Sequence, residues 1–321
     1  MTLTPAVIEA PDGRLSGMRR LAGGRFQMGS DRFYPEEAPV RSVKINPFWI
    51  DERPVTNQAF ARFVEATGHR TVAEIAPDPA MYPGLAPEHA AAASLVFMPT
   101  ERPVPMFDHT QWWALVPGAD WRHPAGPDSG IAGLEDHPVV HIAYTDAESY
   151  AAWAGKALPT EAEWEFAARG GLDGADYAWG DVFEPEGQAM ANYWRGLFPF
   201  ANQRVDGGFR TTAAGTYPAN GHGLFDMIGN VWEWTRDWYA VLPAGKRKSG
   251  GCCVIDNPRG GTLRDSYSTD EAVRIGRKVL KGGSHLCAAN YCQRYRPAAR
   301  HAQMIESPTS HIGFRCVVRR P

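Results

Sequence analysis

The sequence predicts an α+β fold with much irregular loop. Glycine and proline, which favour turns, number 33 and 26 among 321 residues. The 11 tryptophans supply large side chains around which such loops can pack. Segments with the period or the caps of a helix are few, and the other periodic stretches are short. With 44% hydrophobic residues, the chain can bury a sizeable core.

A single domain is expected over 18–321, because no Ser/Gly linker or shift of composition divides it. Residues 1–17 are expected to be a flexible N-terminal extension. Phe26 and Met28 alternate between glycines at the start of the domain, which predicts a strand and a turn. Another strand is expected over 43–50.

The first helix is expected within 54–69. Thr56 or Asn57 would cap its start, and Gly68 would end it. The helical period places three apolar residues on one face: Phe60, Phe63 and Val64.

Residues 70–135 show neither helical nor strand period and are expected to be long loops, which in compact domains are usually functional. Two more helices are expected after them. Each would begin at a capping box, in which a threonine and a glutamate three residues later satisfy the first backbone N–H groups. The two boxes are Thr145 with Glu148, and Thr160 with Glu163. Beyond Gly171, loops and short strands are expected.

The charge balance excludes some functions. A net charge of -3 and a pI near 6.4 leave no basic patch, which argues against a nucleic-acid partner. The first residues hold no apolar core of signal-peptide length, and no stretch reaches the roughly 18 apolar residues of a membrane span. We therefore expect a cytoplasmic monomer with no membrane partner.

Five cysteines, an odd number in a chain of this length, do not indicate a disulfide framework. Cys287 and Cys292 lie five residues apart after two glycines, so both thiols can face one point. A structural zinc site would need four ligands, and no second pair supplies them. Three interpretations stay open on spacing alone: buried core thiols, a redox disulfide, or a two-thiolate site for a soft ion such as Cu(I).

Four motifs together resemble the formylglycine-generating enzymes, the aerobic sulfatase-modifying factors. They are KGGSHLCAANYCQRYR, the GFRC ending, LPTEAEWEFAARGG and GLFDMIGNVWEWT, and the resemblance runs from about 18 to 316. LPTEAEWE and GNVWEW are shared by the wider superfamily, so they indicate the sulfatase-modifying-factor fold, which is related to C-type lectins. The Cys-x4-Cys pair after Gly-Gly-Ser is the specific part.

The resemblance implies oxidation of a cysteine in a Cys-X-Pro-X-Arg motif of an unfolded sulfatase to Cα-formylglycine. Cys287 and Cys292 would hold Cu(I), O2 would be the oxidant, and a thiol reductant would take part. Ser284 matches the family's active-site serine, although a turn role after two glycines is equally compatible with its position. Arg294 and Arg296 are expected to form salt bridges inside the domain. Two histidines near the pair are expected to be structural, His285 and His301.

The resemblance also implies two structural calcium ions. Calcium takes about 6–8 oxygen ligands, so backbone carbonyls must supplement the side chains. Site one would take Asn192, Tyr193, Asp206 and Gly208, and site two would take Asp226, Gly229, Val231 and Glu233. Without the resemblance, an acidic residue in such a loop would be read as a turn or cap residue.

Some residues depart from the family pattern. Pro297 occupies the position of a half-cystine in secreted relatives, which leaves Cys316 without that partner and agrees with a reducing compartment. Cys252 and Cys253 are adjacent and are expected to be two thiols. The segments ASLVFMP and HAQMIESPTSHIGFRC, which border the peptide groove in the family, also differ from the usual pattern.

Three other functions compete with this one. A non-catalytic binding relative would use the same scaffold without the thiol pair. An iron-dependent sulfoxide synthase of the ergothioneine type would need a histidine triad, and normally an added N-terminal four-helix domain. A thiol-disulfide oxidoreductase would place its pair as Cys-X-X-Cys at a helix N-terminus.

Overall fold

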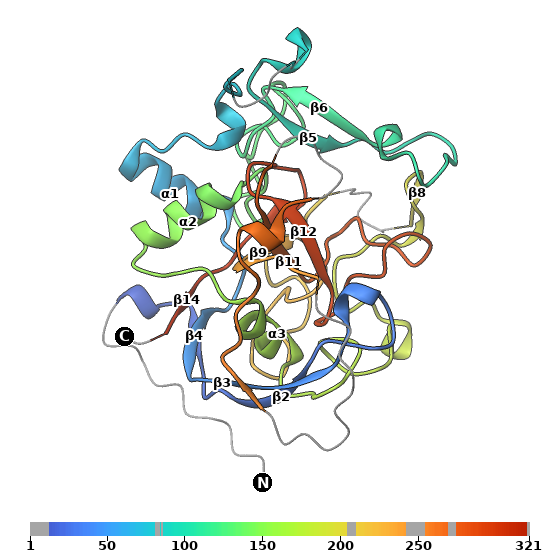
Figure 1. Cartoon of the computed structure of the whole chain (residues 1–321). Helices are drawn as coiled ribbons and strands as arrows, with labels where there is room; N and C mark the ends of the chain where they lie inside the picture. The colour runs from blue at the N-terminus through green and yellow to red at the C-terminus, as the bar shows by residue number, and fades with distance from the viewer. Residues whose placement is uncertain are drawn as a thin grey trace.

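The computed structural model describes residues 13–80, 84, 86–203, 210–241, 254–268 and 274–319. Within them, three short α-helices and several small sheets are joined by long irregular segments (Figure 1). The helices are α1 (Asn57–Thr67), α2 (Tyr144–Trp153) and α3 (Glu161–Arg169). None of the helices in the described part of the chain is long and apolar enough to cross a bilayer. The α+β fold with few helices and much loop is confirmed.

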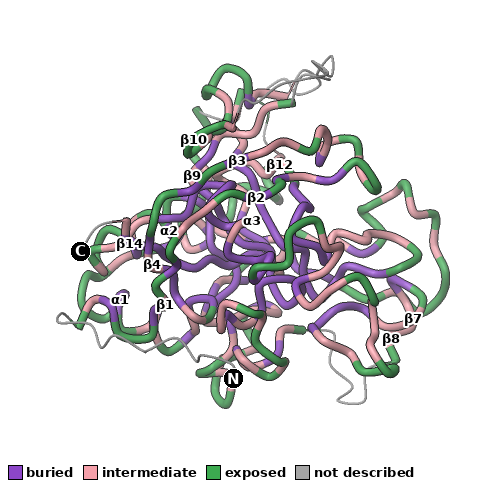
Figure 2. The backbone as a smooth tube through the Cα atoms, turned by 90° about the horizontal axis from the view of Figure 1, so that it is seen from below, coloured by how far each residue is buried: buried purple, intermediate pink, exposed green. Residues whose placement is uncertain are grey.

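The central sheet has the order β12-β11-β9-β13. It consists of β9 (Trp232–Trp238), β11 (Arg277–Lys281), β12 (Arg300–Met304) and β13 (Ile312–Gly313). Helix α3 lies beneath this sheet in Figure 1, and the buried residues gather around it in Figure 2. The main hydrophobic core joins this sheet and α3 to apolar residues from both halves of the chain.

Four smaller sheets surround this centre. Two are three-stranded, with the orders β1-β4-β14 and β10-β3-β2, and two are hairpins, β5-β6 and β7-β8. Their strands are β1 (Met18–Leu21), β2 (Gly24–Met28), β3 (Arg41–Ile45), β4 (Phe48–Asp51), β5 (Ala93–Phe97), β6 (Trp113–Pro117), β7 (Gly196–Leu197), β8 (Ala201–Asn202), β10 (Ile255–Asp256) and β14 (Val317–Val318).

Several expected elements need correction. The strand expected over 43–50 is two strands in different sheets, β3 and β4, separated at Asn46 and Pro47. Residues 70–135 are not all loop, because they contain the β5-β6 hairpin at the top of Figure 1. Packed structure also begins before residue 18: Leu15 is buried against Met18 and Val318.

The helix caps show which helix ends could be predicted from the neighbouring residues alone. Thr56 caps α1, and Gly68 ends it in the left-handed conformation, both as predicted. The capping box of Thr160 with Glu163 is confirmed at α3. The box of Thr145 with Glu148 is wrong, since the N-cap of α2 lies two residues before Thr145.

At α2, the N-cap residue is Ala143, which has no side chain able to accept a hydrogen bond. The carboxylate of Asp146 accepts a hydrogen bond from the Ala143 N–H at 3.0 Å. Thr145 is therefore an exposed residue inside the helix, and its side chain makes no cap.

Replacing Thr160 by alanine is expected to lower the free energy of unfolding by about 1 kcal/mol, because the hydroxyl that accepts the Glu163 N–H is lost. Thr145→Ala is the matched control and should change the free energy of unfolding by less than about 0.5 kcal/mol. Urea denaturation measures both. Equal effects of the two substitutions would contradict the assigned caps.

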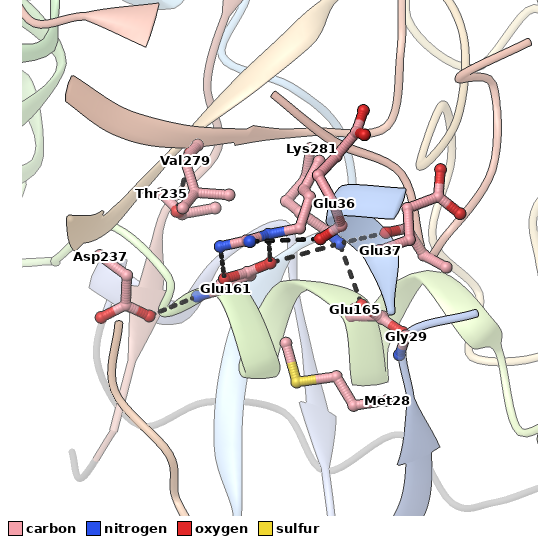
Figure 3. A network of polar contacts seen from close by, with 12 residues as sticks. Met28, Gly29, Glu36, Glu37, Glu161, Glu165, Thr235, Asp237, Val279 and Lys281 are labelled. Carbon is pink, nitrogen blue, oxygen red and sulfur yellow. Dashed lines mark hydrogen bonds and ion pairs between the residues drawn. The ribbon is translucent and has the colours of Figure 1, made fainter. Parts of the chain in front are cut away.

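A network of buried charges joins α3 to the central sheet (Figure 3). The Lys281 ammonium group, which is fully buried, lies 2.9 Å from the Glu165 carboxylate. Arg169 pairs with the same carboxylate at 2.7 Å, and Arg300 pairs with Glu161 at 2.7 Å. Burial alone would raise the pKa of Glu165, but the charges of Lys281 and Arg169 outweigh it and lower that pKa to about 2.

Acid should therefore weaken the fold through Glu165. Its pKa falls from an ordinary 4.5 to about 2 on folding, so its contribution is present above pH 4.5 and is lost as the pH falls towards 2. The full contribution is on the order of 3 kcal/mol. Urea denaturation between pH 7 and acid should show a shallower loss of stability for Glu165→Gln than for the unmodified chain. Parallel curves would refute this assignment.

Candidate active site

The thiol pair lies on the loop that leaves β11. Gly282 and Gly283 both have positive φ, at 93° and 71°, which turns the chain immediately after Lys281. A Cβ atom on Gly283 would lie 2.6 Å from the carbonyl oxygen of Arg294, so only glycine allows the two ends of this loop to approach. The glycines before the cysteines thus have a steric function.

Two backbone turns then bring the cysteines together. The Cys287 N–H donates to the Ser284 carbonyl at 3.0 Å, and the Cys292 N–H donates to the Ala288 carbonyl at 2.9 Å. The two sulfur atoms lie 3.1 Å apart. A disulfide would hold them at about 2.05 Å, so these are two free thiols within hydrogen-bond distance. The expectation that both face one point is met.

The two thiols have opposite electrostatic environments. Cys287 is 2% exposed, and burial raises its pKa well above the ordinary range. The hydrogen bond between the two sulfur atoms, together with the Arg294 charge, lowers the pKa of Cys292 to about 6. The surroundings therefore favour a negative charge on Cys292 over one on Cys287.

An aromatic cluster packs against the residues on either side of Cys287, which are Leu286 and Ala288. The Trp194 N–H donates to the Cys287 carbonyl at 2.9 Å, which ties the loop to the segment before β7. The Tyr291 ring stacks on Phe198 with ring centroids 4.5 Å apart, and burial raises the pKa of its hydroxyl to about 12. Phe97 from β5 packs against Trp194 in the same cluster. The thiols thus lie beside a largely apolar surface.

The other residues predicted near the pair have mainly structural contacts. Ser284 is fully buried, and its Oγ accepts the Leu286 N–H at 3.2 Å, which is the turn role. The ion pairs expected for Arg294 and Arg296 are confirmed, with Glu36 and Glu37 respectively. His285 Nδ1 donates to the Asn230 carbonyl at 2.8 Å, in agreement with the structural role expected for it.

His301 lies on β12, with its ring centroid 5.8 Å from that of Trp232. The described cysteines at 287, 292 and 316 are all free, as expected for Cys316. Cys252 and Cys253 lie outside the described residues.

The two segments expected to border a peptide groove lie side by side. The Ser310 N–H donates to the Leu95 carbonyl at 2.9 Å, and the Phe97 N–H donates to Ser310 Oγ at 3.1 Å. A cavity of about 400 Å³ adjoins them and is lined by His285, the residue after Ser284. These contacts join β5 to the C-terminal segment near the thiol loop.

The residues predicted for calcium are only partly described, since Asp206 and Gly208 of site one lie outside the described residues. Asn192 lies next to site two, because its carbonyl accepts the Asn230 N–H at 2.8 Å. Tyr193 is buried, and its hydroxyl donates to Glu184. No group of three or more His, Cys, Asp or Glu side chains in the described residues could by itself hold a metal ion.

In site two, Asp226 suits a cation but Glu233 does not. Asp226 Oδ1 is buried without a hydrogen-bond partner, while Oδ2 accepts the Gly215 N–H at 2.7 Å. Burial raises the pKa of Asp226 to about 6. The carboxylate of Glu233 instead accepts hydrogen bonds from Arg315 at 2.7 Å and from Trp164 Nε1 at 2.8 Å.

The backbone around site two is tightly packed. Gly229 has a φ of 76°, and a Cβ atom there would lie 2.5 Å from the Asn192 carbonyl oxygen. Val231, the residue immediately before β9, is buried. A calcium ligand set with Asp226 Oδ1 and backbone carbonyls therefore agrees with the donors present, while the Glu233 side chain is occupied by a guanidinium.

Sequence reasoning missed the segment Tyr34–Glu37, which lies beside the thiol loop. The Gln293 N–H donates to the Tyr34 hydroxyl oxygen at 3.0 Å, and Glu36 pairs with Arg294 at 2.5 Å. These partners are separated by 258 or more residues in the chain. No local pattern signals such a pairing.

Comparisons with known proteins agree with this geometry. The family model for the sulfatase-modifying factor enzyme 1-like domain matches residues 4–320. The chain is 51% identical over 297 residues to a formylglycine-generating enzyme of Mycobacterium tuberculosis, covering 92% of this chain and 96% of that protein. It is 44% identical over 307 residues to the Streptomyces coelicolor formylglycine-generating enzyme, covering 94% and 88% respectively.

More distant relatives include a protein without activity. The inactive C-alpha-formylglycine-generating enzyme 2 of Bos taurus is 37% identical over 314 residues, covering 96% of this chain and 90% of that protein. Among solved structures, PvdO from Pseudomonas aeruginosa has a TM-score of 0.61 and 22% identity, covering 94% of this chain and 93% of PvdO, and so supports the fold alone. From the family match and these identities, the chain belongs to the sulfatase-modifying factor enzyme 1-like family.

Proposed function

We propose that this chain is an enzyme that converts a cysteine in a Cys-X-Pro-X-Arg motif of an unfolded sulfatase to Cα-formylglycine. Cys287 and Cys292 hold Cu(I), O2 is the oxidant, and a thiol reductant supplies electrons. The observation that supports it most directly is the pair of free thiols whose sulfur atoms lie 3.1 Å apart on one loop. Relatives at 51% and 44% identity carry the name of this activity.

The donor set fits copper in its reduced state. Two sulfur atoms are soft ligands, and soft ligands favour Cu(I) over harder ions. Among the described residues, no carboxylate or imidazole is hydrogen-bonded to either sulfur, and the side-chain partners of the two sulfurs are each other and Arg294. When bound, Cu(I) would supply a redox-active centre with open positions for the substrate sulfur and O2.

The chain's own groups prepare this site. The surroundings lower the pKa of Cys292 and raise that of Cys287, so Cys292 is the thiol that loses its proton more easily, and metal binding would require the thiolate form of both. The aromatic cluster of Trp194, Phe198 and Tyr291 packs against the loop on either side of Cys287, which is itself 2% exposed. Ser284 fixes the turn that carries Cys287, and we assign it a role near the substrate sulfur.

The overall reaction balances without a further cofactor. The substrate cysteine gives two electrons and the reductant gives two, which together with four protons reduce O2 to two waters. Hydrolysis of the resulting thioaldehyde consumes one water and releases hydrogen sulfide, which leaves the aldehyde on the substrate. The reductant is thus required at every turnover.

We also propose a structural calcium ion at Asp226 and the neighbouring carbonyls, and a second ion at the site predicted around Asn192. The unpaired Asp226 Oδ1 supports the first of these. The free state of the described cysteines is compatible with a reducing compartment, so we place the enzyme in the cytoplasm. We also propose that it is a monomer.

The test uses a synthetic Leu-Cys-X-Pro-X-Arg peptide incubated in air with Cu(I)-loaded protein and a thiol reductant, read by mass spectrometry. The peptide cysteine should become an aldehyde only when copper, O2 and reductant are all present. The controls are copper-free protein and a peptide with serine in place of cysteine. Absence of conversion under the complete conditions would refute the proposal and favour a non-catalytic binding protein.

A further inference from the structure

We propose that Arg294, fixed by Glu36 and Tyr34, is a positioning residue for the thiol pair: its guanidinium holds the sulfur of Cys292 and supplies positive charge beside the metal-bound thiolates. This inference rests on the proposed copper site. It concerns three side chains that lie outside the pair itself and that no motif of the sequence singled out together.

The guanidinium reaches the reacting sulfur directly. Arg294 Nη1 lies 3.9 Å from Cys292 Sγ, within the range of a hydrogen bond to sulfur. Arg294 follows Cys292 by two residues, so the same loop carries both groups. Two thiolates and one Cu(I) carry a net charge of one negative unit, and burying that charge is costly unless a positive group lies near it.

The orientation of Arg294 is fixed from two sides. Glu36 Oε1 accepts from Nη2 at 2.5 Å and from Nε at 3.2 Å, which leaves Nη1 as the nitrogen that faces the sulfur. The Tyr34 ring lies under the guanidinium, with its centroid 3.8 Å from Cζ. Both members of the ion pair are only about one-fifth exposed, so the arrangement is largely shielded from water.

The adjacent arginine has a different environment. Arg296 is fully buried, pairs with both oxygens of Glu37 and donates to the Gln293 carbonyl at 2.8 Å. It therefore anchors the segment Pro35–Glu37 to the loop and forms no hydrogen bond with either sulfur. The two neighbouring ion pairs therefore have different functions. The pair of Arg296 with Glu37 fixes the segment against the loop, and Glu36 on that segment then orients the guanidinium of Arg294.

The test measures Cu(I) affinity by anaerobic competition with a chromophoric Cu(I) chelator, a readout independent of turnover. Arg294→Gln should weaken Cu(I) binding by about 10- to 100-fold, the usual effect of losing a group that supports metal ligands. Arg294→Lys keeps the charge but loses the planar fork, so its affinity should fall between those of Arg294→Gln and the unmodified chain.

Arg122→Gln is the matched control. Arg122 also pairs with a glutamate, Glu74, at 3.0 Å and also lies over an aromatic ring, that of Trp121. It should leave Cu(I) affinity unchanged. Unmodified affinity in Arg294→Gln would overturn the inference, and so would an equal loss in Arg122→Gln.

Two outcomes separate this inference from the proposed function. If the unmodified chain binds Cu(I) but converts no peptide, the proposed activity fails while the role of Arg294 is still decided by the affinities. If the unmodified chain binds no Cu(I), the inference fails. Should Arg294→Gln not fold, as judged by its urea transition, Arg294→Lys carries the test, and an affinity equal to that of the unmodified chain overturns it.

Discussion

Cys287→Ala and Cys292→Ala are each expected to abolish conversion of the peptide cysteine, with a loss of more than about 1000-fold in turnover. A loss of that size is usual when one member of an interdependent catalytic group is removed. Each substitution leaves a single sulfur where two lie 3.1 Å apart. One thiolate cannot supply the two-sulfur donor set that suits Cu(I).

The fold should survive both substitutions. Cys287 is buried in the main core, where a free cysteine behaves as a small apolar residue, and Cys292 is only half-buried. Apart from each other, the side chain that the two sulfurs contact is that of Arg294, and neither sulfur joins distant elements of the fold. Urea denaturation should therefore show a cooperative transition for each variant, close to that of the unmodified chain.

Cys316→Ala provides the control for both. Cys316 is also a free, buried cysteine, but it lies next to β14, where its N–H donates to Asp51 at 2.8 Å. Mass spectrometry of the peptide after a fixed time should show aldehyde with Cys316→Ala and none with the other two. Turnover at the unmodified rate in Cys287→Ala or Cys292→Ala would contradict the assignment of the pair.

The structural features that the sequence predicted correctly depend on residues close to one another in the chain. The ends of α1 and the capping box of α3 depend on residues within one helical turn of each other, and both predictions are confirmed. The β5-β6 hairpin was missed because its strands are short and joined by a long loop with its own turns, so no period of two stood out. The helix start at Ala143 was missed because the capping carboxylate belongs to Asp146 rather than to Glu148.

The candidate site likewise combines contacts between residues close in the chain, which the sequence predicted, with contacts between distant residues, which it did not. Cys287 and Cys292 lie on one loop, so their spacing in the sequence was enough to predict that their thiols face one point. The residues that support them come from the other end of the chain, with Glu36 contacting Arg294 across 258 positions. Such pairs form only because the fold places β2 and β3 beside the central sheet. No pattern of neighbouring residues predicts that placement.

Glu233→Gln is expected to lower the free energy of unfolding by about 3–5 kcal/mol, the usual result of removing one partner of a buried ion pair. Arg315 is fully buried, and both oxygens of Glu233 accept hydrogen bonds from it. Without that carboxylate, the guanidinium would remain in the core with carbonyl groups alone, those of Phe225 and Asp226 among them. Urea denaturation should show this loss equally with calcium and with a calcium chelator.

The effect of Asp226→Asn on the free energy of unfolding should depend on calcium, unlike that of Glu233→Gln. This substitution therefore tests which carboxylate of site two binds the ion. Because burial raises the pKa of Asp226 to about 6, its charge is unfavourable in the folded state at neutral pH, and asparagine removes that cost when calcium is absent. With calcium present, the same substitution should cancel the stabilisation that the ion provides to the unmodified chain. If instead the loss in Glu233→Gln appears only with calcium, the Glu233 carboxylate is itself the ligand and Arg315 is not its main partner.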